Sequence, residues 1–161
     1  MRRPPPRHTH GGVVARLGRQ LERALADTEL SLPQYRLLLH LAGGSSAQAN
    51  LAAKLAVSPP SVTAVVDGLV SRGFVARRPD DADRRRVVHV LTAKGRKALR
   101  DAETATEARL TEIVALLDDP AEVKRAMEGL ELWERALEAW RAAKPKPPVP
   151  HPASPRTRLR T

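Results

Sequence analysis

Apolar side chains recur every three or four residues along most of this chain, which is the spacing of helices that bury one face. Serine and proline at the starts and glycine at the ends interrupt the pattern and set the limits of the predicted helices. Helices are expected over residues 13–28, 31–43, 45–55, 58–73, 92–117 and 121–143.

Two short β-like segments separate the fourth and fifth of these helices, Phe74 to Arg78 and Val87 to Leu91. The loop between them holds three aspartates and then three consecutive arginines, Arg84, Arg85 and Arg86. A helix-turn-helix followed by an arginine-tipped hairpin is the outline of a winged-helix DNA reader, in which one helix enters the major groove and the cationic wing reaches the backbone and the minor groove. The predicted fold is therefore mainly α with a small β-wing.

The net charge of +10 is unevenly distributed along the chain. Residues 13–143 carry 20 basic and 18 acidic side chains, yet residues 72–100 alone carry ten basic and three acidic ones. The positive charge is thus concentrated at the predicted wing and at the start of the helix that follows it. That is where a DNA-binding protein needs to neutralise phosphates, so the distribution favours DNA as the partner.

Composition excludes several other classes of protein. The chain has no cysteine, which rules out disulfide scaffolds, cysteine-based zinc sites, iron–sulfur clusters and thiol redox sensing. Four aromatic residues are too few for a reader that stacks bases on a sheet. No nucleophile–base pair, phosphate-binding loop or metal constellation is recognisable, so neither an enzyme nor a cofactor is expected. No run of about 20 apolar residues is present, and we expect a cytoplasmic protein without a membrane partner.

The two ends of the chain are basic and rich in proline. Residues 1–12 and 144–161 are expected to be a disordered arm and a disordered tail, because they hold too few apolar side chains to form a core. They would add non-specific affinity for DNA, or they are simply low-complexity extensions. His8 and His10 do not complete a metal site on their own.

The helix that opens at Ser58 is the predicted recognition helix. Its first turns carry short side chains, which permit a close approach to base edges, and its free N–H groups offer a phosphate site. Asp67, midway along the solvent face, is expected to form a salt bridge within the protein, because an acid near DNA is repulsive. Ser61 and Thr63 could instead satisfy local backbone groups. The residues expected to contact DNA are Ser58, Pro59, Pro60, Ser61, Thr63 and Ala64, together with Arg84, Arg85 and Arg86 of the wing.

The last predicted helix carries an apolar stripe that it cannot bury alone. Its members are spaced 4, 3, 3, 4 and 3 residues apart. A partner subunit is the simplest recipient, and together with the first helix the stripe could supply the roughly 2,000 Å² that obligate dimers bury. The expected homodimer interface consists of Leu17, Leu21, Val123, Met127, Leu130, Trp133, Leu137 and Trp140.

A set of residues within this order of helices and strands closely resembles the MarR family, the multiple-antibiotic-resistance-type regulators. The most specific part is Asp83-Arg84-Arg85, followed six residues later by Leu91-Thr92 and then Gly95. The resemblance covers residues 13–143. The other matching residues are Leu51, Ala52, Leu55, Val57, Ser58, Val62, Thr63, Val66, Asp67, Leu69 and Gly73.

The resemblance implies a homodimeric winged-helix transcriptional regulator. Its DNA-binding lobe would span about residues 33–92, and its dimerisation helices residues 13–28 and 93–143. Arg85 would enter the minor groove, and Asp83 would hold Arg85 in place by an ion pair. From the residues alone, Asp83 could instead be a turn-former, and the three arginines a solubilising hairpin loop. The chain departs from commoner members at Ala64, where a longer polar or basic residue is frequent, so direct base readout there would be weak.

Many members of the family also bind small phenolic or other lipophilic ligands in a crevice between the two lobes. Tyr35 and His40 lie on the helix that usually lines that crevice, although packing within the core is the alternative role for both. The chain lacks the cysteines of the peroxide-sensing branch and the histidine and acid cluster of the zinc-sensing branch.

The function expected from these features is a sequence-specific double-stranded DNA-binding regulator. It would act as a repressor on a pseudo-palindromic operator and be released by a small-molecule effector. The alternative is a non-specific architectural or nucleoid-type DNA binder. A winged helix used only for protein–protein contact would not need the segregated positive charge.

Overall fold

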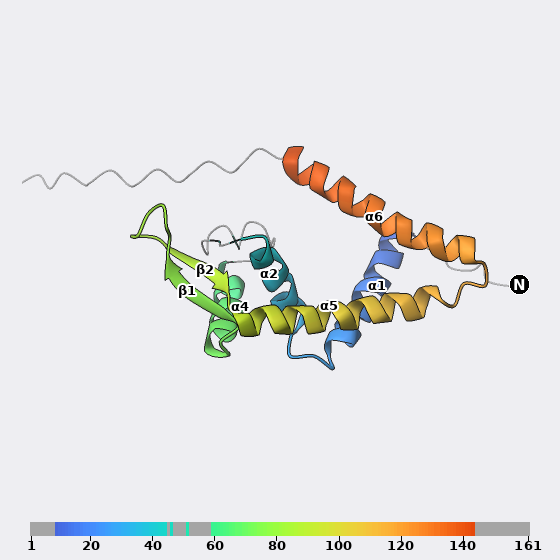
Figure 1. Ribbon diagram of the computed structural model, residues 1–161. Helices are drawn as coiled ribbons and strands as arrows, with labels where there is room; N and C mark the ends of the chain where they lie inside the picture. Colours follow the sequence, from blue (N-terminus) through green and yellow to red (C-terminus); the bar gives the residue numbers. More distant parts are fainter. Residues whose placement is uncertain (1–8, 45, 47–50, 52–58, 144–161) are drawn as a thin grey trace, which may run out of the picture. The chain divides into compact units, whose positions relative to one another are not determined.

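The computed structural model describes residues 9–44, 46, 51 and 59–143 of the chain (Figure 1). Residues 1–113 and 114–161 form two separate compact units, and each is described by itself. Within the described residues, the first unit contains four helices and a hairpin of two strands, and the second contains one helix. In chain order the helices and strands are α1 (His10–Leu25), α2 (Leu32–Ala42), α4 (Pro59–Ser71), β1 (Val75–Pro79), β2 (Val87–Leu91), α5 (Ala93–Val114) and α6 (Pro120–Ala143).

The first helix begins earlier than its apolar pattern predicts. The Thr9 hydroxyl accepts a hydrogen bond from the Gly12 N–H at 3.1 Å, so α1 starts at His10 rather than Val13. The prediction that the N-terminal arm extends to residue 12 is therefore wrong for residues 10–12, because a side-chain cap outweighs the weak helix propensity of Gly11 and Gly12. Residues 1–8, the tail 144–161 and most of the helix expected over residues 45–55 lie outside the described residues.

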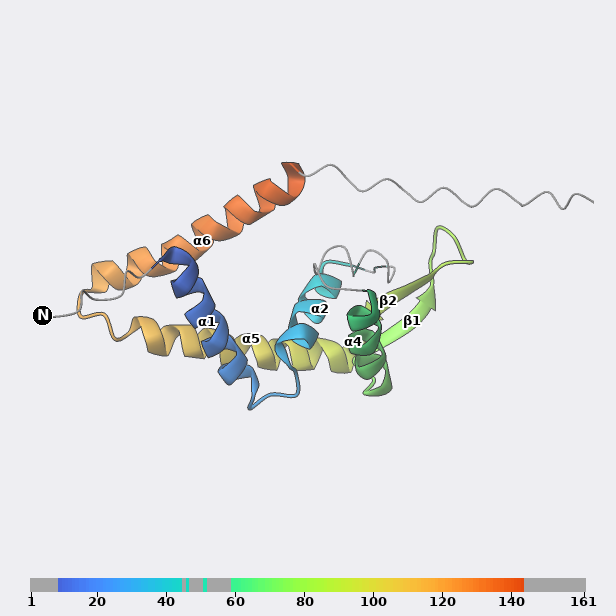
Figure 2. The same ribbon diagram turned by 180° about the vertical axis from the view of Figure 1, so that it is seen from behind.

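The hydrophobic core of the first unit lies where α2, α4, the base of the hairpin and the first half of α5 meet. Figure 2 shows α2 beside α4, with the hairpin next to α4. Leu38 from α2, Val66 from α4 and Phe74 after α4 are each fully buried. The cluster also includes Leu25, Leu30, Leu37, Leu41, Leu51, Val62, Leu69, Val75, Ala98, Leu99 and Ala102.

The end of α4 is closed by a Schellman motif. Gly73 adopts φ +75°, the Phe74 N–H donates to the Leu69 carbonyl at 2.9 Å, and the Gly73 N–H donates to the Val70 carbonyl at 2.9 Å. Phe74 and Leu69, the hydrophobic pair that accompanies such a motif, are both fully buried. The chain then enters β1, which pairs antiparallel with β2 from Val75 opposite Leu91 to Pro79 opposite Val87.

The start of α5 packs directly on this turn. The Thr92 hydroxyl donates to the Gly73 carbonyl at 2.7 Å and accepts from the Gly95 N–H at 3.0 Å. Gly95 lies so close to the Phe74 peptide that a Cβ atom there would sit 2.0 Å from the Phe74 carbonyl oxygen. In the Leu-Thr-x-x-Gly pattern, the threonine therefore caps the start of α5, and the glycine allows α5 to pack closely against the turn after α4.

The second unit consists of α6 and the turn before it. The Asp119 carboxylate accepts from the Ala121 N–H at 2.8 Å, so this helix begins at Pro120, one residue before the predicted start. None of its residues is buried. Among the helices that the structure describes, none is long and apolar enough to cross a membrane.

Candidate nucleic-acid interface

The tip of the wing is a closed turn in which acidic side chains bind main-chain groups. The Asp80 carboxylate accepts from the Ala82 N–H at 3.0 Å, and the Asp83 carboxylate accepts from the Arg85 N–H at 3.1 Å. Main-chain bonds from Asp80 to Arg86 and from Arg86 to Asp83 complete the turn. As a result, the side chains of residues 84–86 are exposed on a tip whose backbone is fixed.

The predicted ion pair between Asp83 and Arg85 is not formed. Asp83 holds the backbone of Arg85, and no ion pair of the Arg85 guanidinium is present in the described part of the chain. The reason is local geometry, since an aspartate readily bonds the amide two residues on. The guanidinium therefore stays available to a ligand.

The predicted recognition helix, α4, buries one face and exposes the other. Val62, Val66 and Leu69 are buried, whereas Thr63 and Ala64 are exposed. Pro59 and Pro60 occupy the first two helical positions, as predicted, and Ser61 follows them in the helix. Ser58 lies outside the described residues, so its predicted capping role is a proposal only.

Asp67 of α4 forms an ion pair with Arg77 of β1, which confirms the salt bridge within the protein that the sequence predicted for this acid. Both side chains are about half exposed. The pairing removes an uncompensated negative charge from the solvent face of the recognition helix, where it would repel phosphate.

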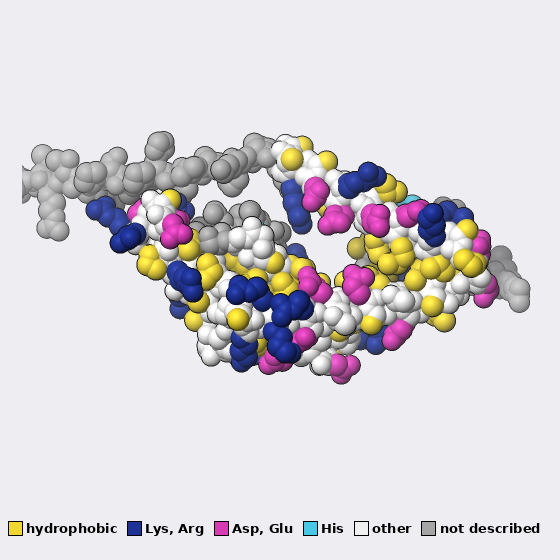
Figure 3. All heavy atoms as spheres, in the orientation of Figure 1, with side chains coloured by type: hydrophobic (Ala, Val, Ile, Leu, Met, Phe, Trp, Pro, Cys, Tyr) yellow, Lys and Arg dark blue, Asp and Glu magenta, His cyan; other side chains and the backbone are white. Residues whose placement is uncertain are grey.

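Basic side chains gather on one part of the first unit. Figure 3 shows Lys and Arg at the wing tip and over the first turns of α5, with Asp and Glu farther along α5. Arg72, Lys94, Lys97 and Arg100 are all exposed. Arg72 and Lys94 also lie over the Phe74 ring, 4.6 and 4.8 Å from its centroid, so two of these cations have fixed stems.

His89 of β2 is a functional candidate that the sequence did not reveal. Its side chain is buried at 2% exposure, and its Nδ1 lies 3.3 Å from the Ser46 carbonyl oxygen. Because a carbonyl only accepts, Nδ1 carries the proton and donates, and the buried Nε2 has no hydrogen-bond partner among the described residues. Burial lowers the pKa of His89 below its ordinary value, so the ring is neutral at pH 7.

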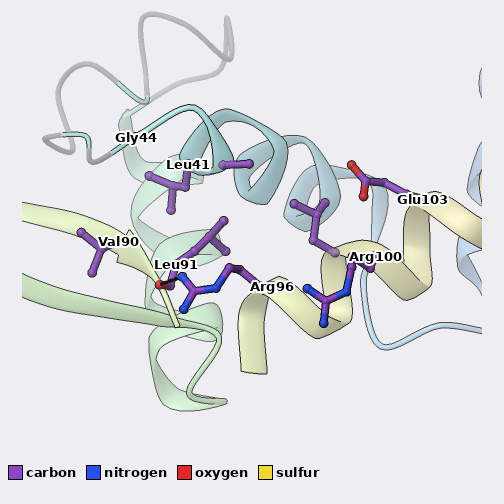
Figure 4. A pocket seen from close by; sticks show the side chains of 9 residues that line it. Leu41, Gly44, Val90, Leu91, Arg96, Arg100 and Glu103 are labelled. Atoms are coloured by element: carbon purple, nitrogen blue, oxygen red, sulfur yellow. Dashed lines mark hydrogen bonds between the residues drawn. The ribbon is translucent and has the colours of Figure 1, made fainter. Parts of the chain in front are cut away.

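A pocket of about 390 Å³ lies between the end of α2, β2 and the first turns of α5 (Figure 4). Arg96 donates to the Leu91 carbonyl at 3.0 Å, and Arg100 lies one turn further along the same helix. The walls of the pocket combine apolar side chains with these two arginines. The lining residues are Leu41, Ala42, Gly44, Val90, Leu91, Arg96, Leu99, Arg100 and Glu103.

Neither Tyr35 nor His40, the residues predicted for a ligand site, lines this pocket. Tyr35 packs against the hydrophobic core, and burial raises its phenol pKa while a hydrogen bond with the Thr106 side chain acts in the opposite direction. The position of Tyr35 supports packing within the core, which the sequence analysis gave as the alternative to a ligand-binding role. The pocket is instead lined in part by Arg96 and Arg100. The sequence showed that these arginines belong to a basic segment, but it did not show which residues of α2 and β2 lie beside them.

The residues predicted for a dimer interface form a stripe with substantial exposure on α6. Leu130 is 40% exposed, Trp133 66% and Leu137 48%. Val123 and Met127 of α6, and Leu17 and Leu21 of α1, are half-buried.

No group of three or more potential metal ligands occurs within the described part of the chain.

Comparison with known proteins adds independent evidence. A profile of the MarR family matches residues 28–86. The HTH-type transcriptional repressor Rv2887 of Mycobacterium tuberculosis H37Rv is 33% identical over 123 residues, covering 73% of this chain and 87% of that protein. The reduced form of MarR from E. coli has a TM-score of 0.66 at 22% identity, covering 76% of this chain and 94% of that one. CouR from Rhodococcus jostii RHA1, solved bound to p-coumaroyl-CoA, has a TM-score of 0.59 at 26% identity, covering 74% and 87%.

Proposed function

The chain belongs to the MarR family of helix-turn-helix transcriptional regulators, which are not enzymes, and we propose that it is a sequence-specific repressor that binds double-stranded DNA as a homodimer. The observation that carries this proposal is the wing tip. The side chains of Arg84, Arg85 and Arg86 are exposed, and two of the three aspartates of this turn, Asp80 and Asp83, accept hydrogen bonds from main-chain N–H groups. Such a tip presents unpaired cations in a fixed place, which suits phosphates and a narrow minor groove.

The recognition helix α4 would lie in the major groove with its first turns against the base edges. Thr63 and Ala64 are the exposed residues of these turns whose side chains are described, and Pro59, Pro60 and Ser61 precede them. Arg85 would enter the minor groove, with Arg84 and Arg86 on the adjoining backbone. Because Ala64 offers no hydrogen bond, readout at its position would come from shape and from apolar contact with a thymine methyl group.

The homodimer is supported by the exposed stripe on α6. Leu130, Trp133 and Leu137 would cost free energy if left in water, and a second copy of the same helix offers a matching surface. A two-fold dimer places its recognition helices on a pseudo-palindromic operator, with half-sites about one helical turn apart.

A small-molecule effector is the regulatory part of the proposal. The structure of CouR with p-coumaroyl-CoA supports it, because that related protein was solved with an acyl-CoA bound. The pocket beside α5, rather than Tyr35 and His40, is the proposed site in this chain, since it offers apolar walls and the Arg100 guanidinium. A ligand that favours the non-binding state by several kcal/mol would release the operator.

Measuring DNA affinity with the purified protein tests the proposal. Its own upstream intergenic DNA and a scrambled fragment of the same length would be compared by fluorescence anisotropy at about 150 mM salt, and a specific reader prefers its operator by roughly a thousandfold or more. Equal and weak binding to both, falling steeply with salt, would support a non-specific architectural protein instead.

A further inference from the structure

We infer that the Asp67–Arg77 ion pair is a latch that sets the position of the wing relative to the recognition helix, and that Arg77 is a positioning residue, not a phosphate contact. The inference rests on the proposed DNA-binding function and deepens it. Asp67 lies on α4 and Arg77 on β1, so the pair joins the two parts that would contact DNA.

The strand register shows why Arg77 reaches α4. Arg77 is paired with His89, and Val75 with Leu91 two positions nearer the base of the wing, so these four side chains share one face of the hairpin. Val75 lies in the core cluster with Val66 of α4. The Arg77 side chain therefore leaves the strand on the face that packs against the recognition helix.

The wing is held at its base from two sides. On one side, the β2 main chain exchanges hydrogen bonds of 2.9 and 3.2 Å with Ser46 at His89. On the other side, β1 is held to α4 by Arg77 and Asp67. His89, the residue that the first attachment holds, is buried and is paired in register with Arg77, so the two attachments lie opposite each other on the two strands.

The latch lies at the point where the wing leaves the protein. Beyond it, all side chains from Asp81 to Val87 are exposed, and Arg85 follows Arg77 by eight residues. The Asp67–Arg77 pair thus links the side chains of α4 and β1 at the base of the wing. A small rotation at Arg77 would consequently move the tip arginines by a larger distance.

The charges of the pair also bear on selectivity for the operator. A bare carboxylate at position 67 would repel phosphates, whereas a bare guanidinium at position 77 would attract them on any DNA sequence. Pairing cancels both effects. Asp67→Asn should therefore release Arg77, raise the affinity for scrambled DNA and reduce the preference for the operator.

The test compares wild type with Asp67→Asn, Arg77→Gln and the charge-swapped double variant Asp67→Arg/Arg77→Asp, with Arg78→Gln as the matched control on the neighbouring strand position. Affinities for operator and scrambled DNA are measured over a range of salt concentrations. Arg77→Gln should weaken operator binding by roughly three- to tenfold, because a dimer carries two latches, each a half-exposed pair. Because Arg77→Gln leaves the Asp67 carboxylate unpaired, the salt dependence is compared in the neutral variant Asp67→Asn/Arg77→Gln, which loses the ion pair without a change in net charge and should keep the salt dependence of wild type. The charge-swapped variant should recover most of the loss in operator affinity.

Two results would overturn the latch. The neutral variant Asp67→Asn/Arg77→Gln could weaken binding to operator and scrambled DNA equally and with a shallower salt dependence, which would mark Arg77 as a phosphate contact. Alternatively, the charge-swapped variant could bind no better than Arg77→Gln. Amide hydrogen exchange of the free protein provides a readout without DNA: the latch predicts faster exchange in β1 and β2 of Arg77→Gln, but not of Arg78→Gln, with α5 unchanged. Wild type that does not prefer its operator would refute the proposed function, whereas unchanged exchange in Arg77→Gln would refute the latch.

Discussion

Replacing Gly95 by alanine tests whether the junction between the recognition helix and α5 is as tight as the structure shows. An added Cβ would lie 2.0 Å from the Phe74 carbonyl oxygen and 2.9 Å from the Phe74 carbonyl carbon. Both are backbone atoms held by the Schellman turn and cannot rotate away. The first turn of α5 would have to move outward by about 1 Å to reach the closest separation that real side chains show, about 3 Å.

The magnitude follows from what this movement breaks. Overpacking costs about 1–3 kcal/mol, and a shift of that size stretches the bonds from the Thr92 hydroxyl to Gly73 and from the Thr92 N–H to Phe74, each worth about 1 kcal/mol. Alanine is favoured over glycine within a helix by up to about 1 kcal/mol, which offsets part of the loss. The expected change is a destabilisation of roughly 2–4 kcal/mol.

The assay is urea unfolding followed by circular dichroism at a fixed protein concentration, because association makes apparent stability concentration-dependent. Gly68→Ala in α4 is the control, since no atom lies within 4 Å of its added Cβ; it should be neutral or stabilising by up to about 1 kcal/mol. If Gly95→Ala unfolded at the same urea concentration as Gly68→Ala, the close contact between α5 and the Phe74 peptide would be refuted.

Four other predictions concern DNA binding, pH and assembly. Arg85→Ala should weaken operator binding by about 1–3 kcal/mol in an anisotropy titration while leaving the unfolding midpoint unchanged; unaltered affinity would remove its minor-groove role. Asp83→Asn keeps an oxygen that accepts from the Arg85 N–H, so it should bind DNA nearly as wild type, whereas Asp83→Ala should lose affinity; equal losses would favour an ion pair instead. Because burial lowers the pKa of His89, protonation costs more in the folded state. Above the ordinary histidine pKa of about 6.5 the ring is neutral in both folded and unfolded protein, and the free energy of unfolding should decrease as the pH drops below that value. If the free energy of unfolding of His89→Gln depended on pH between about 7 and 5 as strongly as that of wild type, this role of His89 would be refuted. Trp133→Glu should yield monomers in analytical ultracentrifugation, since an unpaired charge buried in the interface costs several kcal/mol; an intact dimer would place the interface elsewhere.

Local signals in the sequence determined most of the secondary structure. The proline pair before α4, the glycine at its end and the Asp-Arg-Arg run between two β-like segments predicted helix, turn and wing, because each depends on residues within one or two turns of the chain. The start of α1 was predicted wrongly, because Gly11 and Gly12 indicated the end of a flexible arm and not a first helical turn capped by Thr9. The residues of the proposed DNA-binding surface were predicted from the same local patterns and from the family resemblance.

Only the tertiary structure decided which side chains meet. Asp67 was predicted to pair within the protein, but its partner Arg77 lies ten residues away across a turn, and strand register alone puts that arginine on the inner face. His89 and Ser46 are 43 residues apart, and the pocket beside α5 combines three segments. Helix caps and periodicity are properties of neighbouring residues, which a sequence displays. Burial, charge pairing and pocket walls depend on distances that arise only when remote segments pack together.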